Sequence, residues 1–194
     1  MDVGADHGLL EKYLIDNEIV KHIIAVENKK GPLDILKNNL IGYDITISYS
    51  DGIKDITPEV DTLVLAGMGG MLIVNILNSD SSKLKNVKHI IIDAHKDIEF
   101  VRREISKLGY YIKTEKIVYE NNIYYFVINF ESGNKKLTDI EYEFGVNISM
   151  DPLFEKYRES QIEKMMEISK FDESIKEKIE RLKSLWIKTH FLEH

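Results

Sequence analysis

The chain has 194 residues, of which 43% are hydrophobic and none is cysteine, and its formal net charge is −7. The absence of cysteine excludes disulfides, thiolate metal sites and a cysteine nucleophile. No apolar run approaches the ~20 residues of a membrane helix, and no signal peptide is visible, so we expect a cytoplasmic protein without a membrane partner. The acidic balance argues against a surface that binds nucleic acid on every side, although a local basic face is compatible with it.

Strands and helices alternate through the first half of the chain. Short β-branched runs predict strands at 23–26, 45–49, 62–66 and 89–92, and the chain begins inside a first strand whose leading residues we expect to be missing. Helices are predicted from Gly31-Pro32 to Gly42, at 71–77, and from Asp97, acting as N-cap, to Gly109. The apolar face of the helix at 71–77 is predicted to comprise Leu72, Ile73, Ile76 and Leu77.

The pattern then changes to two long strands, 111–119 and 123–130, joined only by Glu120-Asn121-Asn122. So short a link predicts an antiparallel hairpin, because parallel strands need a crossover. The whole order predicts an α/β fold, a Rossmann-like class I methyltransferase sheet with an antiparallel last strand.

Two amphipathic patterns follow the polar segment 132–136 and are separated near 171–174, which predicts a C-terminal antiparallel helical (coiled-coil) hairpin. We therefore expect a methyltransferase domain over 1–134, the hairpin domain over 135–191 and a remnant of a purification tag at 192–194.

Four short segments each follow a predicted strand, so they would meet at one edge of a parallel sheet, where ligands bind. They are Asp2-Val3-Gly4-Ala5-Asp6-His7-Gly8, Glu27, Asp51-Gly52 and Ala66-Gly67-Met68-Gly69-Gly70. Their glycines allow close approach of the backbone and their carboxylates accept hydrogen bonds. This layout predicts an S-adenosylmethionine pocket that comprises Asp2, Gly4, Asp6, Glu27, Asn28, Asp51, Gly52, Ala66, Gly67 and Met68.

Each polar group of this pocket has an expected role and a plainer alternative. Asp6 would accept a hydrogen bond from the cofactor's ammonium group, above the turn that Gly4 and Gly8 permit. Glu27 would bind the ribose hydroxyls, assisted by Asn28, and Asp51 would accept from the adenine amino group. The alternative for the glycine segment with Asp6 is an ordinary strand-to-helix turn. For Glu27 it is a surface carboxylate at a strand end, and for Asp51 it is an Asp-Gly turn.

No catalytic group is identified from the sequence. Candidates for the side that faces a target base are Gly67, Met68 and Gly69, together with His7 and His95. The glycines could instead serve close helix–strand packing, and the two histidines could be structural. No histidine pair has metal-ligand spacing, so no metal is expected.

With these segments placed, the chain resembles the bacterial tRNA methyltransferases that modify N1 of adenine 22. The resemblance is carried by the Asp2–His7 and Ala66–Gly70 segments, by Lys30-Gly31-Pro32 and Asp51-Gly52, and by Phe144-Gly145 with Pro152-Leu153-Phe154. It implies methyl transfer from S-adenosylmethionine to N1 of an adenine in tRNA, with S-adenosylhomocysteine as product. Family members also carry a leading helix and a full first strand, and a Gln-Pro type segment where Asp93-Ala94-His95 stands here.

By the same resemblance the partner is tRNA. Candidate contacts are Lys29, Lys30, Arg102, Arg103 and one face of the helical hairpin, and we expect a monomer. One alternative is a non-catalytic or truncated module that binds S-adenosylmethionine or RNA, which the short first strand favours. Another is a nicotinamide-dependent oxidoreductase, against which Asp51-Gly52 and the closing strand hairpin argue.

Overall fold

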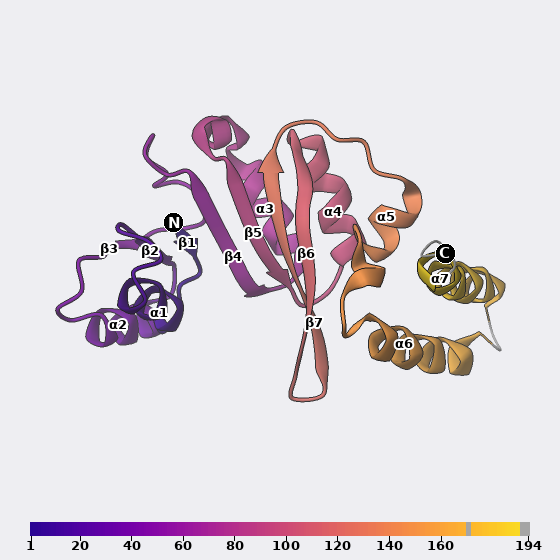
Figure 1. Ribbon diagram of the computed structural model, residues 1–194. Helices are drawn as coiled ribbons and strands as arrows, with labels where there is room; N and C mark the ends of the chain where they lie inside the picture. Colours follow the sequence, from indigo (N-terminus) through magenta and orange to yellow (C-terminus); the bar gives the residue numbers. More distant parts are fainter. Residues whose placement is uncertain (170–171, 191–194) are drawn as a thin grey trace.

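The computed structural model describes residues 1–169 and 172–190. Seven strands form one sheet in the order β3-β2-β1-β4-β5-β7-β6 (Figure 1). The strands are β1 (Asp2–Val3), β2 (Ile24–Glu27), β3 (Thr46–Tyr49), β4 (Thr62–Met68), β5 (His89–Ala94), β6 (Tyr110–Glu120) and β7 (Ile123–Ser132). The first five run parallel, and β7 lies antiparallel between β5 and β6. The predicted fold class is confirmed.

Seven helices are present among the described residues. They are α1 (Leu9–Asp16), α2 (Lys30–Asn39), α3 (Gly70–Ser79), α4 (Ile98–Lys107), α5 (Asp139–Phe144), α6 (Phe154–Ile168) and α7 (Glu173–His190). Short 3-10 turns occupy Ser81–Asn86 and Ile148–Met150. None of the described helices is both long and apolar enough to cross a membrane. Part of the expected turn at 171–174 and the expected tag remnant at 192–194 lie outside the described residues.

The main core lies between the sheet and helices α3 and α4, which cover one face of β4, β5, β7 and β6 (Figure 1). From α3 the side chains of Ile73, Val74 and Leu77 are buried there. The predicted apolar face of this helix was therefore partly wrong. Leu72 is 52% exposed and Ile76 is only partly buried.

The other face of these strands is only partly covered. It presents Val64 and Ala66 from β4, Ile91 and Asp93 from β5, and Val127 from β7, all of them half-buried or exposed. We call these five residues the open face. They alternate along each strand with core residues such as Leu65, Ile92 and Ile128, as the two-residue period of a strand requires.

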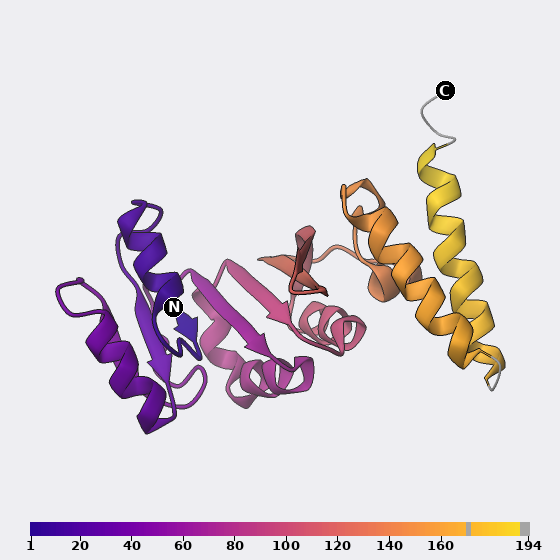
Figure 2. The same cartoon turned by 90° about the horizontal axis from the view of Figure 1, so that it is seen from below.

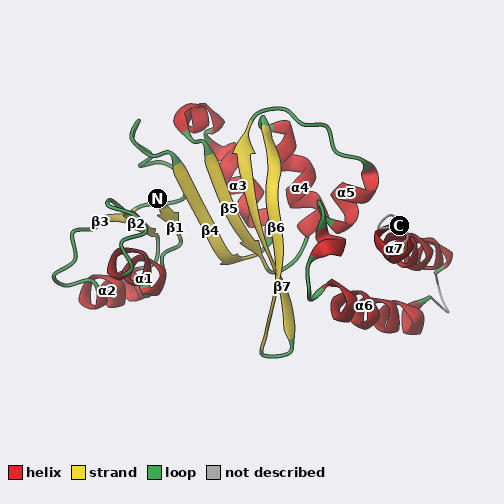
Figure 3. Ribbon diagram, in the orientation of Figure 1, coloured by secondary structure: helices red, strands yellow, loops and turns green. Residues whose placement is uncertain are grey.

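The β6–β7 hairpin extends past the end of β5 (Figure 3). Asp93, near the end of β5, pairs with Val127, so the segment 123–126 of β7 projects beyond the sheet together with its partners on β6. The hairpin tip therefore stands at the carboxyl edge of the parallel strands.

The expected N-cap role of Asp97 was wrong. Asp97 precedes α4 but its side chain makes no capping hydrogen bond. Its backbone has φ of 61°, in the left-handed region, whereas a capping residue normally adopts an extended conformation that directs its side chain at the first free N–H groups.

Helices α6 and α7 lie side by side at the end of the molecule opposite the N-terminal strands (Figure 2). A buried ion pair fixes the segment that precedes them in the chain. The Arg102 Nε donates to Glu115 Oε1 over 3.1 Å, and Arg102 Nη1 donates to the carbonyls of Tyr142 and Glu143, each over 3.0 Å. The backbone N–H of Val146 donates to Glu115 Oε2 over 3.3 Å. One arginine thus ties α4 to β6 and to the segment that leads to α6.

Candidate active site

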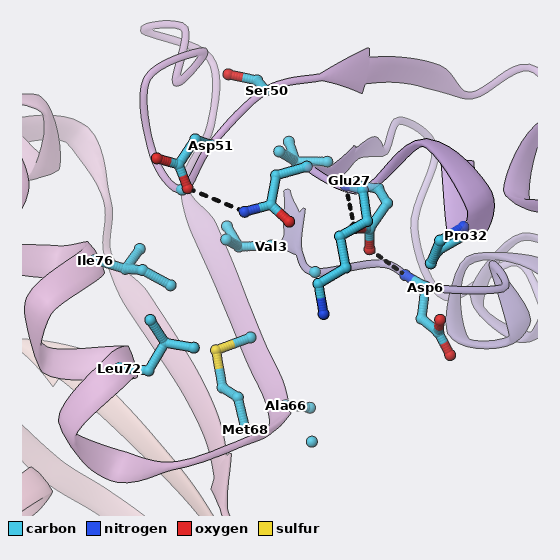
Figure 4. Close-up of a pocket in the computed structure, with 16 residues that line it drawn as sticks. Val3, Asp6, Glu27, Pro32, Ser50, Asp51, Ala66, Met68, Leu72 and Ile76 are labelled. Carbon is cyan, nitrogen blue, oxygen red and sulfur yellow. Dashed lines mark hydrogen bonds between the residues drawn. The ribbon is translucent and has the colours of Figure 1, made fainter. Parts of the chain in front are cut away.

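A cavity of about 400 Å³ opens at the carboxyl ends of β1, β2, β3 and β4 (Figure 4). Of the residues predicted to bind the cofactor, all except Asp2 line it. The full lining is Val3, Gly4, Asp6, Val26, Glu27, Asn28, Lys29, Pro32, Ser50, Asp51, Gly52, Ala66, Gly67, Met68, Leu72 and Ile76. Four segments far apart in the sequence meet here because parallel strands end at one edge.

The turn after β1 forms the floor of the cavity. Gly4 has φ of 86°, and the N–H groups of Gly4 and Ala5 both donate to the carbonyl of Val26, over 2.8 and 2.9 Å. A Cβ atom at Gly4 would lie 3.0 Å from the Met68 Cε, so a side chain here would push against segment 66–70, the end of β4 and the turn into α3, which we call the β4 loop. Glycine at this position keeps the floor low and open to a ligand.

Glu27 is held by backbone groups at the end of β2. Its side chain is 6% exposed; Oε1 accepts from the N–H of Lys29 over 2.7 Å, and Oε2 accepts from the N–H of Asp6 over 3.3 Å. Each carboxylate oxygen can accept a second hydrogen bond. Glu27 is therefore fixed in orientation and still able to bind hydroxyl groups.

Asn28 and Asp51 connect the ends of β2 and β3. Asn28 Nδ2 donates to Asp51 Oδ1 over 3.2 Å, and the Lys54 ammonium lies 3.4 Å from Asp51 Oδ2 (Figure 4). Gly52 has φ of 67°, and a Cβ atom on it would lie 3.1 Å from Ile76. The Asp-Gly pair is thus a tight turn and also part of the cavity wall.

The remaining wall is apolar and comes from the end of β4 and from α3. Met68, Leu72 and Ile76 line the cavity opposite Glu27 (Figure 4). Sequence reasoning assigned Leu72 and Ile76 to the core because they share the helical spacing of core residues. Their position in the turns directly after a glycine loop was the signal that would have placed them at the site.

Asp2 lies in β1, two residues before Gly4. It faces a second cavity, of about 380 Å³. It is 8% exposed and neighbours Glu11, which is fully buried and whose carboxyl group interacts with that of Asp2. Burial, and then the charge of Asp2, raise the pKa of Glu11 to about 8.

The two histidines proposed for the target side are placed differently. His7 does not line the cavity; its half-exposed side chain lies 3.7 Å from the Asp6 carboxylate. The N–H of His95 donates to the carbonyl of Met68 over 3.0 Å, which holds His95 against the β4 loop. No cluster of three or more metal-ligating side chains occurs in the part of the chain that the structure describes.

The basic residues proposed for tRNA contact differ in how exposed they are. Lys29 and Lys30 are exposed beside the cavity. Arg102 was a wrong candidate, because it is 1% exposed and its guanidinium is used by Glu115 and two carbonyls. Arg103 is partly exposed and pairs with Glu99 and Asp139.

The strand order, the antiparallel β7 and a ligand cavity at the ends of β1, β2 and β4 define the class I methyltransferase fold. Within that class, the chain belongs to the tRNA (adenine(22)-N(1))-methyltransferase family, whose model matches residues 1–190. The tRNA (adenine(22)-N(1))-methyltransferase of Bacillus subtilis is 29% identical over 153 residues, which are 76% of this chain. This chain spans 63% of the length of that relative, less than two thirds.

Solved structures agree with this placement. Sp1610 of Streptococcus pneumoniae in complex with S-adenosyl-L-methionine is 27% identical with a TM-score of 0.89, over 95% of this chain and 90% of that chain. TrmK of M. capricolum in complex with S-adenosyl-homocysteine is 24% identical with a TM-score of 0.82, over 95% of this chain and 89% of that chain, and shows the shared fold.

Proposed function

We propose that this protein transfers a methyl group from S-adenosylmethionine to N1 of adenine 22 in tRNA. The observation that carries the proposal is the cavity at the carboxyl edge, where one buried, backbone-held carboxylate faces an apolar wall across a glycine floor. Family membership and the name of the B. subtilis relative support the choice of substrate.

The cavity residues suit the parts of this cofactor. Glu27 has free acceptor capacity for two ribose hydroxyls, and Asp51, with Asn28 beside it, offers an acceptor to an adenine amino group. Asp6 and the floor at Gly4 would hold the methionine end. The wall of Met68, Leu72 and Ile76 provides contact area for an apolar ring face. When bound, S-adenosylmethionine supplies an electrophilic methyl group, whose bond to sulfur breaks as N1 attacks.

The β4 loop fits a nucleophile that needs no base. Ala66, Gly67 and Met68 place no polar side chain where one would accept a proton. Adenine N1 already has a free lone pair, so the work of the protein is to align N1 with the methyl group and exclude water. Since N1 lies on the Watson–Crick edge, the base must be unpaired or extruded when it reacts.

The tRNA contacts are proposed at Lys29, Lys30 and Arg103 and along one face of α6–α7. Lys29 and Lys30 flank the cavity, and phosphate contacts would make binding salt-dependent. We also keep as proposals a monomeric state, a cytoplasmic location and the division into a catalytic domain over 1–134 and a hairpin domain over 135–191.

The test is transfer of labelled methyl groups into unmodified tRNA, followed by digestion to nucleosides. The expected product is 1-methyladenosine from tRNA with adenine at position 22, and none from the same tRNA with guanine there. Label in another nucleoside would contradict the target. Binding of S-adenosylhomocysteine and tRNA without product would leave a binding module and contradict the proposed activity.

A further inference from the structure

Asp93 presents an unsatisfied acceptor on the open face, beside the β4 loop. Its register partners are Ala66 on β4 and Val127 on β7. Its Oδ1 is buried and accepts no hydrogen bond from any described residue. Buried carboxylate oxygens normally have donors, so the half-buried Asp93 carboxyl group retains acceptor capacity that no described residue uses.

Two rings stand next to Asp93 on the same face. His95 follows it by two residues, and Tyr125 lies two residues before its register partner Val127. The His95 and Tyr125 ring centroids are 5.9 Å apart with the planes at 68°. Tyr125 belongs to the part of the β6–β7 hairpin that projects past the sheet, so the pair forms a wall at the carboxyl edge.

This wall is fixed to the loop that borders the cofactor cavity. The N–H of His95 donates to the Met68 carbonyl over 3.0 Å, and the N–H of Gly70 donates to the Lys96 carbonyl over 3.2 Å. Segments 66–70 and 93–97 are therefore hydrogen-bonded to each other along their length. A base that contacts Ala66–Met68 would lie within reach of Asp93.

We propose that Asp93 determines specificity for the target base by accepting a hydrogen bond from the exocyclic amino group of adenine, with His95 and Tyr125 flanking the ring. The inference rests on the proposed function and deepens it. Adenine places an amino donor beside the lone pair of N1, which suits a carboxylate. Guanine places a carbonyl oxygen there, which a carboxylate repels, and its N1 carries a hydrogen in place of the free lone pair. The same carboxylate lies near the positive charge that the ring acquires on methylation.

The experiment compares two tRNA substrates, one with adenine at the target position and one with purine, which lacks the amino group. Asp93→Ala should lower kcat/KM on the adenine tRNA by about tenfold to a hundredfold, the effect of losing a hydrogen bond to a charged group. On the purine tRNA the variant and the wild type should react at similar rates. Asp93→Asn, which keeps an acceptor oxygen and the shape of the side chain, should lose less and show the same dependence on the amino group.

Asp44→Ala is the matched control, since it removes an exposed carboxylate from the loop between α2 and β3. It should leave both substrates unaffected, and the affinity of each variant for S-adenosylhomocysteine should equal that of the wild type. Equal losses on the adenine and purine tRNAs, or no loss with Asp93→Ala, would overturn the assignment of Asp93 while the proposed function stands. Absence of 1-methyladenosine with the wild-type protein would overturn both.

Discussion

The two halves of the sheet treat buried carboxyl groups in opposite ways. In the C-terminal half, Glu115 is matched by the Arg102 guanidinium and a backbone N–H. In the N-terminal half, Glu11 is equally buried, but the group in contact with it is the Asp2 carboxyl rather than a guanidinium. Burial raises the pKa of both glutamates; the hydrogen-bonded Arg102 guanidinium opposes that rise at Glu115, whereas at Glu11 the Asp2 carboxyl adds to it and the N-terminal ammonium opposes it as the smallest of the contributions. A buried carboxyl group that is paired with a donor can therefore connect two elements, whereas one without a matching donor makes the free energy of unfolding depend on pH.

The largest effect on stability is expected from removing the cation that pairs with Glu115. Arg102→Met leaves the Glu115 carboxylate buried without its cation and should lower the free energy of unfolding by about 3–5 kcal/mol. Urea denaturation would measure this. The double variant Arg102→Met with Glu115→Leu should recover most of the loss, because both charges are then absent. A double variant no more stable than Arg102→Met would contradict the pairing argument.

The next effect depends on pH. A pKa of about 8 for Glu11 means that the folded protein holds a proton that the unfolded chain releases near pH 4.5. The contribution of this group to stability is thus full below about pH 4.5 and is lost as the pH rises toward 8. Glu11→Gln, which cannot ionise, should raise the free energy of unfolding at pH 8 by a few kcal/mol more than it does at pH 5. Equal changes in thermal or urea stability at the two pH values would contradict the raised pKa of Glu11 in the folded protein.

Glu27 tests a third situation, in which backbone N–H groups satisfy a buried carboxylate and leave acceptor capacity for a ligand. Glu27→Ala should weaken binding of S-adenosylhomocysteine by roughly tenfold or more, as expected for lost charge-assisted hydrogen bonds. Isothermal titration calorimetry would measure the affinity, with Asp44→Ala as the control. Unchanged affinity would remove Glu27 from the proposed ribose site.

The smallest effect is expected at the neighbouring arginine. Arg103 pairs with Glu99 and Asp139 near the surface, where such pairs contribute little. Arg103→Ala should change the free energy of unfolding by about 1 kcal/mol or less, so adjacent arginines on one helix should differ several-fold. A loss of stability as large as that of Arg102→Met would show that the exposed fraction of an arginine does not predict its contribution to the free energy of unfolding. If Arg103 contacts tRNA, the same variant should also reduce the salt dependence of tRNA binding.

Much of this architecture could be predicted from the sequence. The carboxyl ends of β2, β3 and β4 were predictable to within two residues, because β-branched runs bounded by glycine and acidic residues specify both the strand and its edge. The closing hairpin followed from the length of one link. These features depend on local pattern alone.

The errors concern choices that local pattern does not determine. Arg102 looked like a surface cation because its partner Glu115 lies on β6, and only the packed fold brings them together. Leu72 and Ile76 had core spacing but face a ligand cavity, since a helix beside a cavity can be apolar on two sides. Asp2 belongs by sequence to the glycine turn, yet its strand position turns the side chain toward Glu11. Each error is a matter of which face a residue presents.

The proposed contact of tRNA with α6 and α7 would set a minimum length for the substrate. The cavity lies at the ends of β1–β4, while the two helices lie beyond β6, at the opposite side of the sheet (Figure 2). With strands ~4.8 Å apart, crossing from β4 past β5 and β7 to β6 takes about 15 Å before either helix is reached. A free nucleoside could fill the cavity but could not touch both places. A molecule that binds at both places, as we propose for tRNA, must therefore be long enough to span this distance.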